Sequence, residues 1–174
     1  MRVTIKNYEK SNTIKTREGK IMETMQGKKN IVLIGMPGAG KSTVGVVLAK
    51  RLGYRFLDSD LVIQEQTKKL LHELITEHGV DGFLKIEEDI NAGLDCEQAV
   101  IATGGSVIYG EKAMEHLREI GCVVYLKLSY KEIEDRLGDL TARGVALKNG
   151  QTLKDLYNER CPLYEKYAHI VQEC

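Results

Sequence analysis

The stretch IVLIGMPGAGKST, residues 31–43, decides the fold of this 174-residue chain. The run from Ile31 to Gly35 is apolar or small and predicts a buried strand, and apolar residues at helical spacing follow Thr43. Between the two, Gly35 to Ser42 matches the phosphate-binding pattern G-x-x-x-x-G-K-[ST] at every fixed position. A strand before the loop and a helix after it distinguish this pattern from a chance glycine-rich turn.

The residues of this loop explain its chemistry. Glycines let successive backbone N–H groups turn inward around a phosphate, and the positive end of the following helix faces the same anion. Lys41 can reach the outer phosphates, and the Ser42 hydroxyl can bind Mg²⁺. We therefore expect an ATP site formed by Gly38, Ala39, Gly40, Lys41, Ser42 and Thr43.

Length and composition favour a single domain and exclude several classes of protein. The formal net charge is zero, so nothing in it indicates nucleic acid or a membrane surface as a partner. The four cysteines form no C-x-x-C pair and the four histidines lack metal-ligand spacing, which indicates free thiols and no zinc site. The longest apolar runs are strand-sized and no signal-peptide core is present. We expect a cytoplasmic monomer.

A second candidate site follows the strand predicted over 54–57, at Asp58-Ser59-Asp60. Two carboxylates at i and i+2 leave a strand on the same side, and the carboxyl end of a parallel strand carries the ligand site. One carboxylate would face Mg²⁺ or its water, and the other a substrate hydroxyl. The alternative is that Ser59 or Asp60 only caps the next helix, and both roles can coexist.

The remainder of the chain alternates between helices and strands. Residues 1–29 are polar and predict an N-terminal tail or extension, and we expect residues 30–174 to form the domain. We expect helices over 61–78, 82–94, 111–119 and 129–137 and from 152 onward, with Gly79 as a break and Pro162 as a kink or break near Arg160. Strands are predicted over 99–102, 122–128 and 169–171. This order predicts a three-layer α/β domain with a parallel sheet.

Two further segments suggest ligand contacts. Thr103-Gly104-Gly105-Ser106 follows a predicted strand, where glycines suit close approach of the backbone to a ligand, although a simple turn explains them equally well. Residues 138–150 have no period, lie between two helices and carry Arg143. This arrangement is typical of a lid over a phosphate site.

Four motifs in this order resemble the shikimate kinase family over residues 30–172. They are the phosphate loop GMPGAGKST, FLDSD at 56–60, IATGGS at 101–106 and the arginine before P-L-Y at 160–164. The resemblance implies a P-loop kinase fold with a five-stranded parallel sheet of order 2-3-1-4-5, substrate-binding helices at about 60–95 and the lid at about 138–150.

The resemblance also implies residue roles. Lys41 and Arg143 would stabilise the moving phosphoryl group, Asp58 would approach the metal through water beside Ser42, and Asp60 would bind and orient the attacking hydroxyl. The backbone of Gly104 and Gly105 would approach the substrate beside Ser106. Arg160 would pair with the substrate carboxylate, and Arg136 would pack on adenine.

The chain departs from the family pattern in its acceptor motifs. The family has F-R-x-x-E where this chain has Phe83-Leu84-Lys85-Ile86-Glu87, so leucine replaces the arginine that grips the carboxylate. Lys85 is an imperfect substitute because it lies about 100° around a helix from that position. Ser106 replaces the third glycine of G-G-G, and the lid reads R-G-V in place of R-P-L.

We therefore expect Mg²⁺-dependent transfer of the ATP γ-phosphoryl group to a hydroxyl of a small metabolite. The first reading is conversion of shikimate to shikimate 3-phosphate, in aromatic amino-acid biosynthesis. The second is a kinase of the same fold for another hydroxylated acid or polyol, such as a gluconate-like sugar acid, which Leu84 and Ser106 favour. The third is a nucleotide-binding module without catalysis, which the intact Lys41 and Asp60 oppose. A nucleoside-monophosphate kinase is disfavoured because no arginine set for a second phosphate is present.

Overall fold

A computed structural model describes residues 27–137 and 150–174 of the chain. Its centre is a five-stranded sheet in the order β2-β3-β1-β4-β5, in which every neighbouring pair is parallel. The order and the parallel pairing confirm the expected sheet. The strands are β1 (Asn30–Ile34), β2 (Arg55–Asp58), β3 (Ala99–Ala102), β4 (Gly121–Lys127) and β5 (Ile170–Glu173).

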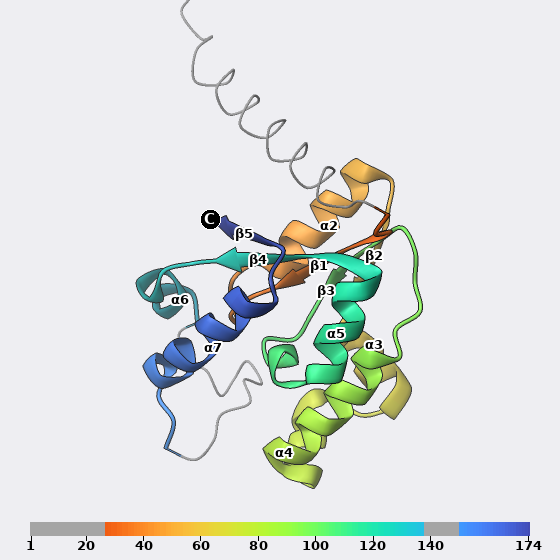
Figure 1. The fold of residues 1–174 in the computed structure, drawn as a ribbon. Coiled ribbons are helices and arrows are strands. Elements are labelled where there is room, and N and C mark those ends of the chain that lie inside the picture. The colour runs from red at the N-terminus through yellow and green to blue at the C-terminus, as the bar shows by residue number, and fades with distance from the viewer. Residues whose placement is uncertain (1–26, 138–149) are drawn as a thin grey trace, which may run out of the picture.

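Helices cover both faces of this sheet, as the three-layer prediction required. Helix α2 lies on one face, and α5 and α7 lie on the other (Figure 1). The helices are α2 (Lys41–Leu52), α3 (Ser59–Thr67), α4 (Leu71–Ala92), α5 (Glu111–Ile120), α6 (Tyr130–Leu137) and α7 (Leu153–Tyr167), with a short 3₁₀ helix η1 (Val107–Tyr109).

The sheet forms the core because its central strands are apolar throughout. All residues of β1 and β3 are buried, which is typical of strands covered on both faces. Since all strands are parallel, their carboxyl ends meet at one edge. This edge brings together the phosphate loop after β1, the acidic pair at the end of β2 and the glycines after β3.

The predicted helix over 61–78 is wrong, because α3 ends at Thr67 and α4 begins at Leu71. Lys68 ends α3 in the left-handed conformation (φ 56°), which is rare for lysine, and no glycine marks the break in the sequence. The predicted break at Gly79 is confirmed, because the backbone there is non-helical (φ 69°, ψ 179°) and two helical segments meet across a kink inside α4. The structure therefore keeps the predicted division at Gly79 and adds a second one between Thr67 and Leu71.

A break near Arg160 is also wrong, because α7 runs through Pro162 without interruption. Proline removes one backbone hydrogen bond, but tertiary packing can hold a helix together across it. Arg160, Tyr164 and Tyr167 are buried along α7, and Tyr164 stacks on Tyr125 of β4 with ring centroids 5.0 Å apart.

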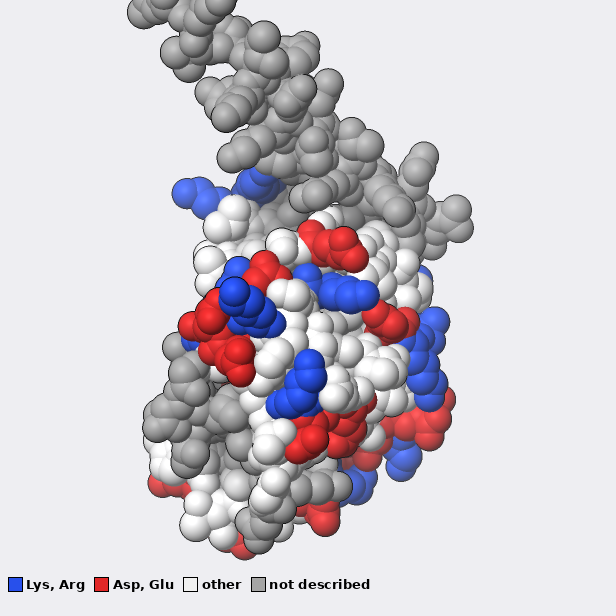
Figure 2. Space-filling view, turned by 90° about the vertical axis from the view of Figure 1, so that its left-hand side faces the viewer, with Lys and Arg blue, Asp and Glu red and all other residues white. Residues whose placement is uncertain are grey.

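The surface charges, the helices and the cysteines add three observations to the fold. Basic and acidic side chains are interspersed on the face shown in Figure 2. Within residues 27–137 and 150–174, no helix is long and apolar enough to cross a membrane. The four cysteines are free thiols.

Candidate active site

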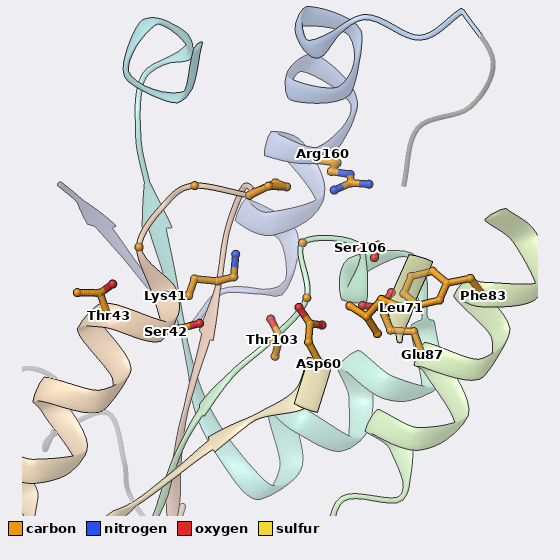
Figure 3. A pocket seen from close by; sticks show the side chains of 15 residues that line it. Lys41, Ser42, Thr43, Asp60, Leu71, Phe83, Glu87, Thr103, Ser106 and Arg160 are labelled. Carbon is orange, nitrogen blue, oxygen red and sulfur yellow. The ribbon is translucent and has the colours of Figure 1, made fainter. Parts of the chain in front are cut away.

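A cavity of about 420 Å³ opens at the carboxyl edge of the sheet, in the size range of small-molecule sites (Figure 3). It joins the phosphate loop to the acidic pair and to α4 and α7. Its walls are formed by Pro37, Gly38, Gly40, Lys41, Ser42, Thr43, Asp60, Leu71, Phe83, Glu87, Thr103, Gly104, Gly105, Ser106 and Arg160. Most of the residues that the sequence singled out therefore share one cavity.

The phosphate loop has the backbone that the glycine pattern predicts. Gly38 and Gly40 adopt φ values of 77° and 90°, which side-chain-bearing residues rarely adopt. The Lys41 Nζ donates hydrogen bonds to the carbonyls of Gly35 (2.8 Å) and Met36 (3.1 Å). This ammonium group is thus held inside the loop, at the wall of the cavity.

Burial lowers the pKa of Lys41 to about 8, and the Asp60 carboxylate acts in the opposite direction. An anion bound in the loop would favour the charged form of this side chain. The loop therefore offers a desolvated cation whose charge becomes more stable when phosphate binds.

Ser42 and Asp58 form a pair of oxygen donors beside the loop. The Ser42 hydroxyl donates to Asp58 Oδ2 (2.9 Å), while Asp58 Oδ1 accepts from the backbone N–H of Asp60 (3.1 Å) and caps α3. The capping residue is thus Asp58, not Ser59 or Asp60 as the alternative proposed. The Asp58 side chain thus caps α3 and contacts Ser42 at the same time.

This pair fits Mg²⁺, which binds through one or two protein oxygens and otherwise through water and phosphate. In the part of the chain that the structure describes, no group of three or more His, Cys, Asp or Glu side chains could hold a metal by itself. The donor set therefore suits a metal that arrives with a nucleotide, and Ser42 and Asp58 would hold it.

Asp60 projects into the cavity from the first turn of α3, facing Lys41 (Figure 3). Burial first and the Asp58 carboxylate second raise the pKa of Asp60 to about 6, although the Lys41 charge acts in the opposite direction. A carboxyl with this pKa is suited to accept a proton from a hydroxyl near neutral pH.

Gly104 and Gly105 allow close packing around the cavity. A Cβ atom on Gly104 would lie under 3.0 Å from both Glu87 Oε1 and Asp60 Oδ1, and one on Gly105 would lie 2.9 Å from Pro37. Neighbouring protein atoms therefore require both glycines, independently of any ligand. A simple turn is therefore not a sufficient account of them.

Arg160 enters the cavity from α7 and is only 2% exposed. Its Nε donates to the Tyr109 hydroxyl (3.2 Å), and the guanidinium lies over the Tyr109 ring. Four residues further along α7, the Tyr164 hydroxyl donates to the carbonyl of Gly105 (2.6 Å). The P-L-Y segment thus aligns the arginine and the glycine loop with each other.

Glu87 is the site residue that the sequence reasoning missed. This side chain is 1% exposed, and its Oε1 has no hydrogen-bond partner among the described residues. Burial raises the pKa of Glu87 to about 7, while a hydrogen bond with Ser106 lowers it. The glutamate of the family's F-R-x-x-E pattern was present in the sequence as a signal. Leu71 and Phe83 form the apolar wall beside it.

Lys85 does not line the cavity. It is exposed and pairs with Asp89 (2.6 Å) and Glu88 (3.6 Å) on the outer face of α4. Leu84 packs against the apolar cluster of Ile63, Leu74 and Phe83. The structure therefore supports neither as a contact to the acceptor.

Two predicted arginines remain to be placed. Arg136, at the end of α6, lies beside the phosphate loop with Nη1 3.5 Å from the Gly38 carbonyl. Arg143 lies outside the described residues.

The predicted nucleotide-binding residue Ala39 does not line the cavity, because it is buried within the phosphate loop.

Comparison with known proteins identifies the family. The sequence model of the shikimate kinase family matches residues 37–173. The chain is 39% identical over 147 residues to a shikimate kinase of Clostridium botulinum, covering 83% of this chain and 87% of the relative. It is 36% identical over 150 residues to a shikimate kinase of Rippkaea orientalis, and the match covers 84% of this chain and 79% of the relative.

Solved structures lead to the same family. Shikimate kinase from Acinetobacter baumannii in complex with shikimate superposes with a TM-score of 0.77 at 34% identity, covering 87% of each chain. The enzyme from Bacteroides thetaiotaomicron gives a TM-score of 0.67 at 29% identity, covering 83% of this chain and 86% of that one. The chain belongs to the shikimate kinase family, whose members transfer a phosphoryl group from ATP to an alcohol acceptor.

Proposed function

We propose that this chain transfers the γ-phosphoryl group of ATP to the 3-hydroxyl of shikimate in the cavity described above. One observation carries the proposal: Lys41 of the phosphate loop, Asp60 and Arg160 line the same cavity of about 420 Å³. These groups suit, respectively, a phosphoryl group, a hydroxyl and a carboxylate. A relative of 34% identity and the same fold has been solved with shikimate.

The phosphate side of the cavity would position ATP. Backbone N–H groups of the loop and the N-terminus of α2 would bind the phosphates, and Lys41 would move from the Gly35 and Met36 carbonyls to the transferring group. Ser42 and Asp58 would hold Mg²⁺, which when bound with the nucleotide neutralises developing phosphate charge. Arg136 would contact the adenine, and Arg143 would close on the phosphates.

The acceptor side would position shikimate. Asp60 would accept a hydrogen bond from the attacking hydroxyl and take its proton during transfer, for which its raised pKa is suited. Arg160 would pair with the shikimate carboxylate through its planar guanidinium, which Tyr109 orients. Catalysis would consist of alignment and charge stabilisation, as is general for phosphoryl transfer.

The test is an ATP-consumption assay with Mg²⁺ that offers shikimate beside a panel of sugar acids and polyols. We expect ADP formation that depends on shikimate and saturates with it. Turnover of a sugar acid or polyol without shikimate turnover would show that Leu84 and Ser106 mark a change of acceptor. ATP binding without turnover of any acceptor would favour a non-catalytic nucleotide-binding module.

A further inference from the structure

Glu87 poses a problem of charge in the acceptor side of the cavity. It is 1% exposed, it lines the cavity from α4, and its Oε1 has no hydrogen-bond partner among the described residues. A buried carboxylate normally has a cation or several donors around it, because desolvating an unpaired charge is costly. The surroundings of this carboxyl therefore decide whether it is charged.

Its own helix supplies no cation to this carboxyl. Leu84, one turn earlier, is apolar and packs against Phe83 and its cluster. Lys85 points outward to Asp89 and Glu88. On α4 the carboxyl therefore has no partner that would hold it ionised.

The elements that line the cavity with α4 bring one further acid and two cations. Gly104 lies between the Glu87 and Asp60 carboxyls, because a Cβ there would meet both. The charge of Asp60 on α3 raises the pKa of Glu87, and the cations of α7 and α2, Arg160 and Lys41, lower it. Burial has the largest influence, so that the pKa lies at about 7.

Ser106 provides the neutral partner. It stands where the family has a third glycine and is 6% exposed. Its hydroxyl is a hydrogen-bonding neighbour of the Glu87 carboxyl and lowers the pKa of that group. A hydroxyl can donate to the ionised carboxylate or accept from the protonated acid. Figure 3 shows Ser106 and Glu87 on the side of the cavity opposite Lys41.

We propose that Glu87 binds the acceptor as a neutral carboxylic acid, so that shikimate and one proton enter the cavity together. This inference rests on the proposed function, because it assumes an acceptor that carries a carboxylate. A neutral acid can donate a hydrogen bond to an acceptor oxygen, whereas an ionised one would add a third negative charge beside Asp60 and the shikimate carboxylate. The Ser106–Glu87 pair would then replace the acceptor contact of the family's arginine, whose place Leu84 takes. Arg160 would supply the positive charge that pairs with the shikimate carboxylate.

The test is isothermal titration calorimetry of the full chain with shikimate, in buffers of different ionisation enthalpy, which counts the protons taken up on binding. At pH 8 we expect uptake approaching one proton, and at pH 6 close to none. With a pKa of about 7, the shikimate affinity should fall about tenfold from pH 6 to pH 8, because only the protonated fraction is competent to bind.

Glu87→Gln keeps the shape and is neutral at every pH. It should fold normally and lose the tenfold fall in shikimate affinity between pH 6 and pH 8. It should also lose most of the proton uptake at pH 8, leaving only the share of Asp60 and Lys41, whose pKa values lie at about 6 and about 8. Ser106→Gly removes the hydrogen bond that lowers the pKa, so the fall in affinity should shift to higher pH. The matched control is Glu88→Gln, since this neighbouring acid contacts Lys85 and the backbone N–H of Lys112 outside the cavity. It should keep the proton uptake of the natural chain.

The outcomes separate this inference from the proposed function. Shikimate binding without proton uptake at pH 8, or the same pH dependence in Glu87→Gln, overturns the inference and leaves shikimate as the acceptor. Failure of the natural chain to bind shikimate at pH 6 and at pH 8, with ATP still bound, overturns the acceptor assignment and the inference with it.

Discussion

The phosphate side and the acceptor side of the cavity are built in different ways. The phosphate side comes from one contiguous segment, residues 35–43, and from the adjacent end of β2. The acceptor side takes single residues from α3, α4, α7 and the loop after β3. A contiguous loop fixes its own geometry through the backbone, whereas a site assembled from distant elements can exchange one residue for another. The departures from the family pattern in the described residues involve this second side: Ser106 lines the cavity there, and Leu84 lies on α4 in the apolar cluster next to Phe83.

The largest effect is expected from Asp60→Asn, which separates chemistry from nucleotide binding. Asparagine keeps the shape but cannot take the proton, so kcat should fall by about 10²- to 10⁴-fold, the usual contribution of a general base. The affinity for ATP, measured by calorimetry, should stay within about twofold of the natural value, as a control of the phosphate side. Full turnover in Asp60→Asn would show that Asp60 does not accept the proton of the attacking hydroxyl.

Lys41→Met should affect the phosphate side alone. The substitution removes the ammonium that Asp60 faces but keeps most of the side-chain length, and kcat should fall by about 10²- to 10³-fold, as for the loss of one charge-stabilising donor. Shikimate affinity without nucleotide is the control and should change little. Parallel losses of shikimate affinity and kcat would show that the two sides are not independent.

Arg160→Lys should affect the acceptor side alone. Lysine keeps the charge but loses the planar guanidinium and its bond to the Tyr109 hydroxyl. We expect the KM for shikimate to rise by about 10- to 100-fold, the range for a hydrogen bond to a charged group. The KM for ATP serves as the internal control. An unchanged KM for shikimate would mean that Arg160 does not bind the shikimate carboxylate.

The smallest effect is expected from Gly104→Ala, which tests the packing between the two carboxyls. The added methyl group would meet Glu87 and Asp60, at a cost of about 1–3 kcal/mol for overpacking. The melting temperature should fall by about 2–4 °C for each kcal/mol.

Gly93→Ala is the control for this substitution, because its new Cβ would lie 3.5 Å or more from any neighbour. Its melting temperature should stay close to that of the natural chain. Equal melting temperatures of Gly104→Ala and Gly93→Ala would mean that Glu87 and Asp60 can move to accommodate the added methyl group without a cost in stability.

The same contrast explains what the sequence could predict. Lys41, Ser42 and the paired aspartates follow from local patterns, since loop and strand end place them. The sheet order came from the family resemblance, because strand spacing alone does not order strands. Glu87 was missed because its burial depends on α4 meeting the loop after β3, which no local pattern encodes. Lys85 was placed wrongly for the same reason: its direction is set by Glu88 and Asp89, on the outer face of α4.

The most direct test of the account is phosphorus-31 NMR of the chain mixed with ATP, Mg²⁺ and shikimate. We expect the γ-phosphate signal to disappear as ADP and a new phosphomonoester signal appear in equal amounts, with the new phosphorus coupled to the proton on carbon 3 of shikimate. Inorganic phosphate as the sole product beside ADP would contradict it. So would ATP that stays unchanged with shikimate while a parallel sample with another acceptor forms ADP and a phosphomonoester.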